Sequence, residues 1–201
     1  YSIDGFRFDL MALIDQDTMR QADRDLRQIN PDIVLFGEPW TGGTSPLRAK
    51  TDKGALHQIP VGAFNDDFRN ALKGQPDGSE PGWIQDGSNR GALTAALRIS
   101  NWFASPAQSI HYMTCHDNLW LWDKLKAAMP GANESLLKAT MKLGYLTLFT
   151  AQGVPFFQGG EEFARSKGGN NNSYDAPDAV NQVDWSLKQK NRDLFNYTRD
   201  L

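Results

Sequence analysis

The sequence has almost no cysteine, no cluster of one charge sign and no hydrophobic run long enough to cross a bilayer. Cys115 is the only cysteine, which excludes an intrachain disulfide framework and leaves the redox compartment open. A formal net charge of −3 with interspersed signs gives no basic patch for nucleic acid or another polyanion. The longest apolar run, residues 143–157, is interrupted by threonine, glutamine and glycine, so we expect no membrane span.

The local signatures of several large enzyme classes are also missing. The chain has no G-x-G-x-x-G after a strand-like run, no P-loop, no G-x-S-x-G and no H-E-x-x-H. Cys115 precedes His116, but neighbouring residues of a strand point to opposite faces. We therefore expect a small buried cysteine rather than a Cys/His nucleophile pair.

The composition supports one sizeable hydrophobic core. Of the 201 residues, 40% are hydrophobic and 11% are aromatic, which favours one domain over two. Strand-like and helix-like stretches alternate along the chain. The predicted strands are residues 3–10, 32–40, 61–65 and 109–115, and a fifth strand with its turn covers residues 153–160. The predicted helices are residues 15–29, 66–73, 92–102, 120–129, 134–150 and a last helix from about 187.

The first predicted strand carries an unusual pattern of charge. Strict alternation places Arg7 and Asp9 on one face beside Gly5, and it places three apolar residues on the other face. Buried charges persist when they are paired and hydrogen-bonded, so this face indicates a site. A salt bridge at a sheet edge is the simpler alternative for an isolated R-x-D, and the residues further along the chain argue against it.

The first two strands and the helix between them form a predicted βαβ unit. Asp15 and Asp17 are the candidate N-caps of the helix, which carries Met19, Leu26 and Ile29 on one apolar face. The second strand is a nearly unbroken apolar run, which is typical of a parallel sheet covered on both faces. Further along, residues 74–91 form an irregular excursion of a length that is usually functional.

Two fold classes accommodate this alternation, a doubly wound sheet and a (β/α)8 barrel. The positions of the polar residues favour the barrel. Asp9, Glu38 and the pair His116-Asp117 follow the C-terminal ends of separate predicted strands, where barrel enzymes place their chemistry. We therefore predict an α/β fold of the (β/α)8 TIM-barrel type.

Two carboxylates that face one cleft are what glycoside hydrolysis requires. Asp9 is the candidate that attacks, and Arg7 on the same face would keep it ionised and oriented. Glu38 is the candidate that protonates the leaving oxygen, for which it needs a raised pKa. Pro39 and Trp40 would supply the apolar wall that raises it.

Further side chains could act on a bound sugar. Asp117 would place a third negative charge near the transition state, and His116 would donate a hydrogen bond to sugar hydroxyls. Sugars also stack on flat aromatic side chains, although most tryptophans in barrels are packing residues. The candidates for stacking are Trp40, Trp120, Trp122 and Tyr174.

Two alternative ion sites are weaker. Gly159-Gly160 could cradle a phosphate, but glycine pairs mostly turn the chain. Residues 65–67 and 170–178 hold oxygen ligands that could take a structural Ca²⁺, but no calcium-loop spacing is present and such clusters are usually turns. We expect no cofactor.

Four motifs follow one another along nearly the whole chain. They are D-G-F-R-F-D at residues 4–9, G-E-P-W at 37–40, H-D-N at 116–118 and G-V-P-F-F-Q-G-G-E-E at 153–162. In this order they resemble the signatures of the α-amylase family, glycoside hydrolase family 13. Within the family, L-W-D-K-L at 121–125 and the run ending in V-D-W at 183–185 are most similar to bacterial type I pullulanases. Isoamylase and glycogen debranching enzymes are similar but usually lack the S-Y-x-A-P-D-x-V-N pattern that begins at Ser173.

The resemblance implies hydrolysis of α-1,6 branch linkages in pullulan, amylopectin or related α-glucans by double displacement. It implies Asp9 as nucleophile, Glu38 as general acid/base and Asp117 as transition-state stabiliser. The residues that it implies at the substrate are Arg7, His116, Trp40, Asn118 and Tyr174. The implied partner is an α-glucan polysaccharide or oligosaccharide.

The chain departs from the family in one respect, because it has no upstream signature of the type D-V-V-Y-N-H. The resemblance thus implies that residues 1–201 are the C-terminal part, about strands four to eight, of a (β/α)8 catalytic barrel. Such a piece exposes two sheet edges, so we expect it to aggregate or dimerise alone and to show little activity. A non-catalytic α-glucan-binding relative is an alternative from another class. The compartment stays open between secreted, cell-surface and cytoplasmic.

Overall fold

The computed structural model describes residues 3–201, which divide into two compact units. The first unit consists of the N-terminal segment through residue 65 with residues 99–110 and 152–154, and the second of residues 66–98, 111–151 and 155–201. Each unit is built around its own cluster of buried apolar side chains.

The first unit contains most of a parallel sheet. Among the described residues, five strands pair in the order β1-β2-β3-β4-β5. Their bounds are β1 (Gly5–Phe8), β2 (Val34–Gly37), β3 (Gly62–Phe64), β4 (Ser109–His111) and β5 (Val154–Pro155). The pairings from β1 to β4 are parallel, with Gly5 opposite Val34 and Ala63 opposite Ser109. This parallel sheet with helical connections confirms the predicted α/β class, and closure into a barrel stays a prediction.

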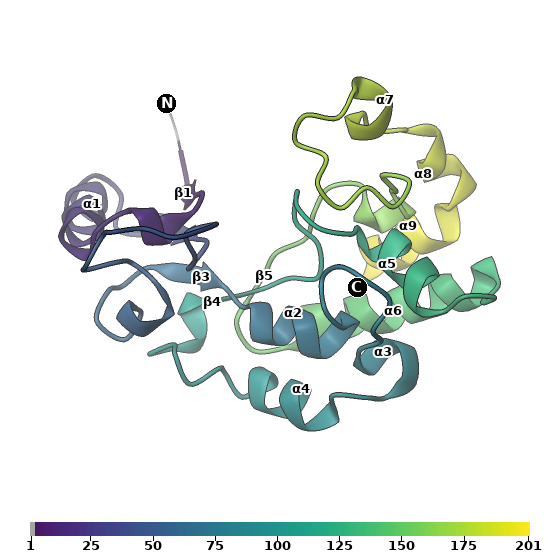
Figure 1. Cartoon of the computed structure of the whole chain (residues 1–201), viewed down its shortest axis with the longest axis horizontal. Helices are drawn as coiled ribbons and strands as arrows, with labels where there is room; N and C mark the ends of the chain where they lie inside the picture. Colours follow the sequence, from purple (N-terminus) through teal and green to yellow (C-terminus); the bar gives the residue numbers. More distant parts are fainter. Residues whose placement is uncertain (1–2) are drawn as a thin grey trace. The chain divides into compact units, whose positions relative to one another are not determined.

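Helix α1 (Gln16–Ile29) connects β1 to β2, as predicted (Figure 1). Asp15 caps it, because its carboxylate accepts a hydrogen bond from the Thr18 N–H at 2.9 Å. Met19 is fully buried in the core of the first unit. Ile29, which the spacing places on the same apolar face, is instead 84% exposed, because it is the last helical residue and lies beyond the core. Three 3₁₀ turns complete the regular structure of the described part of this unit: η1 (Met11–Leu13), η2 (Lys53–Ala55) and η3 (Pro106–Gln108).

The second unit is mainly helical. Its elements are α2 (Asp66–Lys73), α3 (Trp83–Asp86), α4 (Arg90–Leu97), α5 (Leu121–Ala128), α6 (Glu134–Thr150), the 3₁₀ turn η4 (Glu161–Phe163), α7 (Asp178–Asn181), α8 (Ser186–Lys190) and α9 (Arg192–Asp200). Asn133 caps α6 by accepting a hydrogen bond from the Leu136 N–H at 2.9 Å. Met141 and Tyr145 of α6 are fully buried and form the core with residues of α2 and α5, which packs against α6 (Figure 1).

Several predicted element ends are wrong. The fifth strand, predicted with its turn over residues 153–160, covers only Val154–Pro155. The strand predicted over residues 109–115 ends at His111, because the chain then leaves the sheet and Met113 joins the helical core of the second unit. The helix predicted over residues 92–102 covers Arg90–Leu97, because Ile99 takes a left-handed φ of 80° that an α-helix does not allow. No helix within residues 3–201 combines the length and the apolar character that a bilayer span needs.

Candidate active site

Arg7 joins the two carboxylates that the sequence places at the ends of β1 and β2. Its Nη1 donates to Asp9 Oδ1 at 2.5 Å, and its Nη2 donates to Glu38 Oε1 at 2.6 Å. Asp9 directly follows β1 and Glu38 directly follows β2, so the parallel pairing of these strands brings both acids to one edge of the sheet. The predicted common face of Arg7 and Asp9 is confirmed. We call Arg7, Asp9 and Glu38 the Arg7 cluster.

The backbone holds Glu38 from the other side. Glu38 Oε2 accepts a hydrogen bond from the Leu10 N–H at 2.9 Å. Leu10 takes a left-handed conformation with φ 43° and ψ 50°, so it is not the strand residue that alternation predicts. A Cβ on Gly37 would lie 2.6 Å from the Phe8 carbonyl oxygen, so only glycine lets β2 end this close to β1. Both oxygens of Glu38 are therefore fixed.

The two carboxylates differ in their exposure to water. Only 6% of the Glu38 side chain is exposed, whereas 62% of the Asp9 side chain is. Burial raises the pKa of Glu38 above its ordinary value, the Leu10 hydrogen bond and the Arg7 charge partly offset this, and the nearby Asp9 raises it again. One buried acid with a raised pKa beside one exposed acid is the arrangement that a proton donor and a nucleophile need.

The Arg7 guanidinium is itself held in place. It lies over the Phe64 ring of β3, with its central carbon 5.8 Å from the ring centroid. Three adjacent strands thus position this arrangement, because β1 carries Arg7, β2 leads to Glu38 and β3 carries Phe64. A fixed guanidinium presents its planar fork to both carboxylates at once.

His116, Asp117 and Asn118 lie in the second unit, on an irregular segment beyond the end of β4. His116 Nε2 is 3.5 Å from Asp117 Oδ2, and about half of each side chain is exposed. Asn118 has a left-handed φ of 66°, and its N–H donates to the Asn171 carbonyl at 2.9 Å. The Asp117 carboxylate is thus accessible on this unit, and its convergence with the Arg7 cluster stays a prediction.

The aromatic candidates separate by burial. Trp120 is only 1% exposed, and the Arg165 guanidinium carbon lies 4.4 Å from the centroid of the Trp120 ring. The prediction that Trp120 stacks on sugar is therefore wrong. Trp122 packs against the helical core. Trp40 is partly exposed and Tyr174 is 80% exposed, so both stay available as sugar contacts.

Cys115 and His116 are closer than the sequence predicts. The Cys115 Sγ lies 3.3 Å from His116 Nδ1. The expectation that these neighbours diverge is wrong, because the segment is not a strand and strand alternation does not apply to it.

Some polar groups of the two alternative ion sites take part in internal hydrogen bonds. The Gly160 N–H, which a phosphate would need, donates to Glu162 Oε2 at 2.7 Å, and the adjacent Glu161 adds a second carboxyl group. Asn65 is fully buried, and its amide binds the hydroxyls of Ser109 at 2.9 Å and Ser100 at 3.2 Å. Asn65 therefore stabilises the packing of the first unit. The interpretation of Gly159-Gly160 as a phosphate site has no support.

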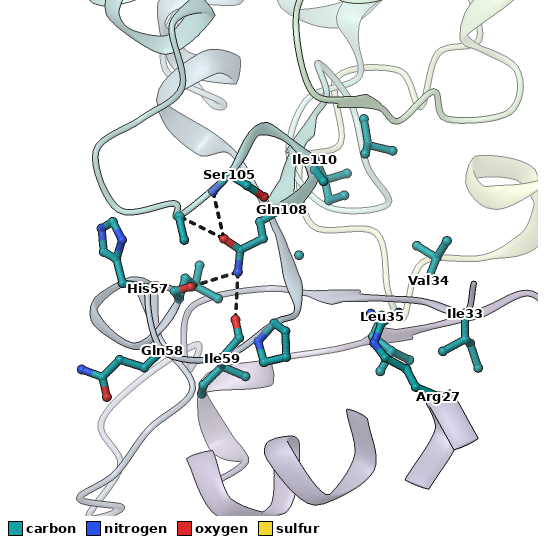
Figure 2. Close-up of a pocket in the computed structure, with 16 residues that line it drawn as sticks. Arg27, Ile33, Val34, Leu35, His57, Gln58, Ile59, Ser105, Gln108 and Ile110 are labelled. Carbon is teal, nitrogen blue, oxygen red and sulfur yellow. Dashed lines mark hydrogen bonds between the residues drawn. The ribbon is translucent and has the colours of Figure 1, made fainter. Parts of the chain in front are cut away.

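A cavity of about 630 Å³ lies at the opposite ends of the strands from Glu38 (Figure 2). Its walls include Ile33, Gly62 and Val154, which precede or begin their strands. The Gln108 side chain at its edge donates to the Ile59 carbonyl at 2.8 Å, which Figure 2 shows as a dashed line. The cavity is mainly apolar and no carboxylate of the described residues lines it, so it lacks the paired acids that glycoside hydrolysis needs.

Sequence reasoning missed the Leu10 N–H and a set of buried lysines. No sequence signal marks a left-handed leucine. Lys73, Lys124 and Lys167 are each at most 9% exposed in the second unit. Nothing in the helical spacing distinguishes Lys73 or Lys124 from an ordinary surface lysine, so only the folded contacts reveal them.

Comparison with known proteins supplies the family context. No protein-family model matches the chain. The pullulanase of Bacillus subtilis (strain 168) is 37% identical over 214 residues, which cover 100% of this chain and 30% of that protein. The solved pullulanase from Bacillus acidopullulyticus is 45% identical, with a TM-score of 0.93, over 98% of this chain and 25% of that one. This chain is pullulanase-like.

The similarity of this pullulanase-like chain extends to a ligand complex. The crystal structure of a pullulanase complexed with maltotriose, from Anoxybacillus sp. LM18-11, is 39% identical with a TM-score of 0.90, over 98% of this chain and 29% of that one. The chain spans less than a third of the length of these relatives. The alignment with the Bacillus subtilis pullulanase covers the entire chain, so the Arg7 cluster and Asp117 both lie within the pullulanase-like region.

Proposed function

We propose that this chain carries the catalytic residues of a retaining glycoside hydrolase that cleaves α-1,6 branch linkages in pullulan- and amylopectin-type α-glucans. The observation that carries the proposal is the Arg7 cluster, in which one guanidinium binds a buried and an exposed carboxylate. The similarity to pullulanases supports the substrate class, as does the maltotriose bound to the Anoxybacillus protein.

The proposed reaction has two displacements. Asp9 attacks the anomeric carbon while protonated Glu38 gives its proton to the glycosidic oxygen, which leaves with the cleaved chain. Glu38, now ionised, takes a proton from water, whose oxygen attacks the same carbon and releases Asp9. Carboxyl groups ~5–5.5 Å apart favour this retaining route, and ~6.5–9.5 Å favours inversion. Two carboxylates bound to one guanidinium fit the shorter spacing.

The remaining roles complete the proposal. Asp117 stabilises the positive charge that develops on the sugar ring. The residues that we assign to glucan binding are Arg7, His116, Trp40, Asn118 and Tyr174. These assignments require the strand ends of both units to meet at one rim, as in the C-terminal part of a (β/α)8 catalytic barrel. Residues 1–201 would then be part of one catalytic domain.

Product analysis on two polymers tests the proposal. The intact protein is incubated with pullulan and, separately, with amylose, and the Asp9→Asn variant serves as the blank. We expect maltotriose from pullulan. Attack on amylose alone would contradict debranching, and new reducing ends from neither polymer would favour the non-catalytic glucan-binding alternative.

The Arg7→Met variant gives a pH-dependent prediction. Glu38 must be protonated to act as the acid, so activity falls as the pH rises through its pKa. The Arg7 charge lowers the pKa of Glu38, so its removal raises that pKa and shifts the alkaline limb of the kcat/KM profile to higher pH. The peak rate should also fall by about 100-fold, because both carboxylates lose their common partner. Arg24→Met, on the exposed face of α1, is the matched control, and an unshifted alkaline limb in Arg7→Met would contradict the assignment.

A further inference from the structure

Asp77 holds the backbone that directly follows Asp117. Its Oδ2 accepts a hydrogen bond from Asn118 Nδ2 at 2.9 Å, and its Oδ1 accepts one from the Leu119 N–H at 3.2 Å. The sequence predicts an irregular excursion over residues 74–91, whose length indicated a function, but the structure forms α3 and the start of α4 within it, so only residues 74–82 and 87–89 are irregular. Asp77 lies in residues 74–82, which we call the excursion from here on. We call residues 116–119 the Asp117 segment. One carboxylate of the excursion therefore fixes two groups of this segment.

The excursion is anchored in turn by Lys124 of α5. Lys124 is fully buried, and its Nζ donates to the Gly78 carbonyl at 3.0 Å and to the Glu80 carbonyl at 2.7 Å. These carbonyls lie one and three residues beyond Asp77. The lysine therefore connects a regular helix to the loop that presents the Asp77 carboxylate.

Two further lysines bind carbonyls of the Asp117 segment. Lys73 Nζ donates to the Leu119 carbonyl at 3.1 Å, and Lys167 Nζ donates to the His116 carbonyl at 3.1 Å. Burial is the main cause that lowers the pKa of Lys73 to about 7. Because burying an ammonium group is unfavourable, its place beneath this segment indicates more than packing.

The segment needs such contacts because no regular element supports it. Residues 116–119 belong to neither a helix nor a strand, and Asn118 has a left-handed φ of 66°. The Asp117 side chain is 58% exposed, so packing does not fix that side chain. Side chains from α2, the excursion and the stretch that follows η4 hold the segment instead. Small displacements of a reacting group are costly, since an error of about 1 Å can lower a rate by about 100-fold.

We propose that Asp77, anchored by Lys124, is a positioning residue that sets the place of the Asp117 carboxylate in the reaction. The inference rests on the proposed function, in which Asp117 stabilises the transition state. It assigns a role to the excursion that neither the motifs nor the Arg7 cluster explains.

The Asp77→Ala variant of the intact protein tests the inference. We expect kcat on pullulan to fall by about 100-fold, because Asp117 acts in the transition state, and KM to rise by a smaller factor, because Asp77 also holds the Asn118 side chain that we assign to glucan binding. Glu80→Gln is the matched control, since it keeps the backbone carbonyl to which Lys124 donates and removes only the charge of an exposed side chain that acts on Lys124 electrostatically. A rise in KM alone, or an unchanged kcat, would overturn the inference.

A double-mutant cycle separates positioning from simple destabilisation. In the Asp117→Asn background, Asp77→Ala should lower kcat by less than about threefold, because the positioned group is already absent. A role limited to folding would give the same loss in both backgrounds and would overturn the inference.

Amide hydrogen exchange provides a readout that does not depend on the substrate. Asp77→Ala should speed exchange of the Leu119 N–H, whereas Glu80→Gln should not. Unchanged exchange would overturn the inference even if the protein had no activity on pullulan. Failure of the wild-type protein on pullulan would instead contradict the proposed function, so the two failures are distinguishable.

Discussion

Replacing Asp9 by asparagine in the intact protein should lower kcat/KM on pullulan by at least ~10⁴-fold, since loss of a nucleophile is among the largest single effects in enzymes. Asparagine has nearly the same shape, but its amide does not form the glycosyl ester. The side chain is mostly exposed, so the variant should fold as the wild type does. Reducing-end release over time, compared with the melting temperature, measures both effects.

Asp32→Asn is the matched control for this variant. Asp32 is an exposed aspartate that precedes β2 in the same unit as Asp9, and it should leave the rate unchanged. Residual activity of Asp9→Asn within tenfold of the wild type would show that another group attacks the sugar.

Replacing Glu38 by glutamine should lower kcat/KM on pullulan by ~10²–10⁴-fold, because the leaving sugar then departs without a proton. The loss should be much smaller on an α-maltotriosyl fluoride, since fluoride needs little help from an acid. Added azide should restore turnover, because it attacks the glycosyl–Asp9 ester without a general base and gives a glycosyl azide of retained configuration. Chromatography of the products measures all three outcomes.

The azide and fluoride results distinguish Glu38 from Asp9. Asp9→Asn should respond to neither, because it forms no ester that azide could attack. Glu134→Gln, at the exposed start of α6, is the matched control for Glu38→Gln. Equal losses of Glu38→Gln on pullulan and on the fluoride would contradict its role as the acid.

The Arg7 cluster was predictable because strand geometry carries over directly from sequence to structure. A period of two places Arg7 and Asp9 on one face, and parallel pairing brings the end of β2 beside the end of β1. The apolar run that ends in Glu38 therefore predicted that Glu38 lies close to Arg7 and Asp9. The raised pKa of Glu38 also follows the prediction in direction, with burial as its largest cause.

The contacts that hold the Asp117 segment were not predictable, because no strand or helix geometry relates the residues that make them. The contacts of Lys73 and Asp77 with residues 118 and 119 join positions more than 40 residues apart along the chain, and no periodic pattern relates them. The end of β4 at His111 was missed because residues 112–114 are buried apolar or hydroxyl side chains that read as a strand. A short apolar run looks the same in a sequence whether helices or a sheet bury it.

Leu10 shows a third limit of sequence reasoning. Alternation makes it the last apolar residue of the first strand, yet it turns into the left-handed region and donates its N–H to Glu38. This conformation is costly for a non-glycine residue and persists where the surroundings determine it. A backbone donor is independent of side-chain identity, so no motif could have indicated it.

Trapping of the covalent intermediate would show whether Asp9 is the nucleophile. The intact protein is incubated with a maltotriosyl fluoride that carries a second fluorine on the ring to be cleaved, which slows release of the ester. Digestion and mass spectrometry then locate the label. We expect one glycosyl adduct on Asp9 in the wild-type protein and none in Asp9→Asn. An adduct on Glu38 or on another carboxylate, or no adduct from a preparation that hydrolyses pullulan, would contradict it.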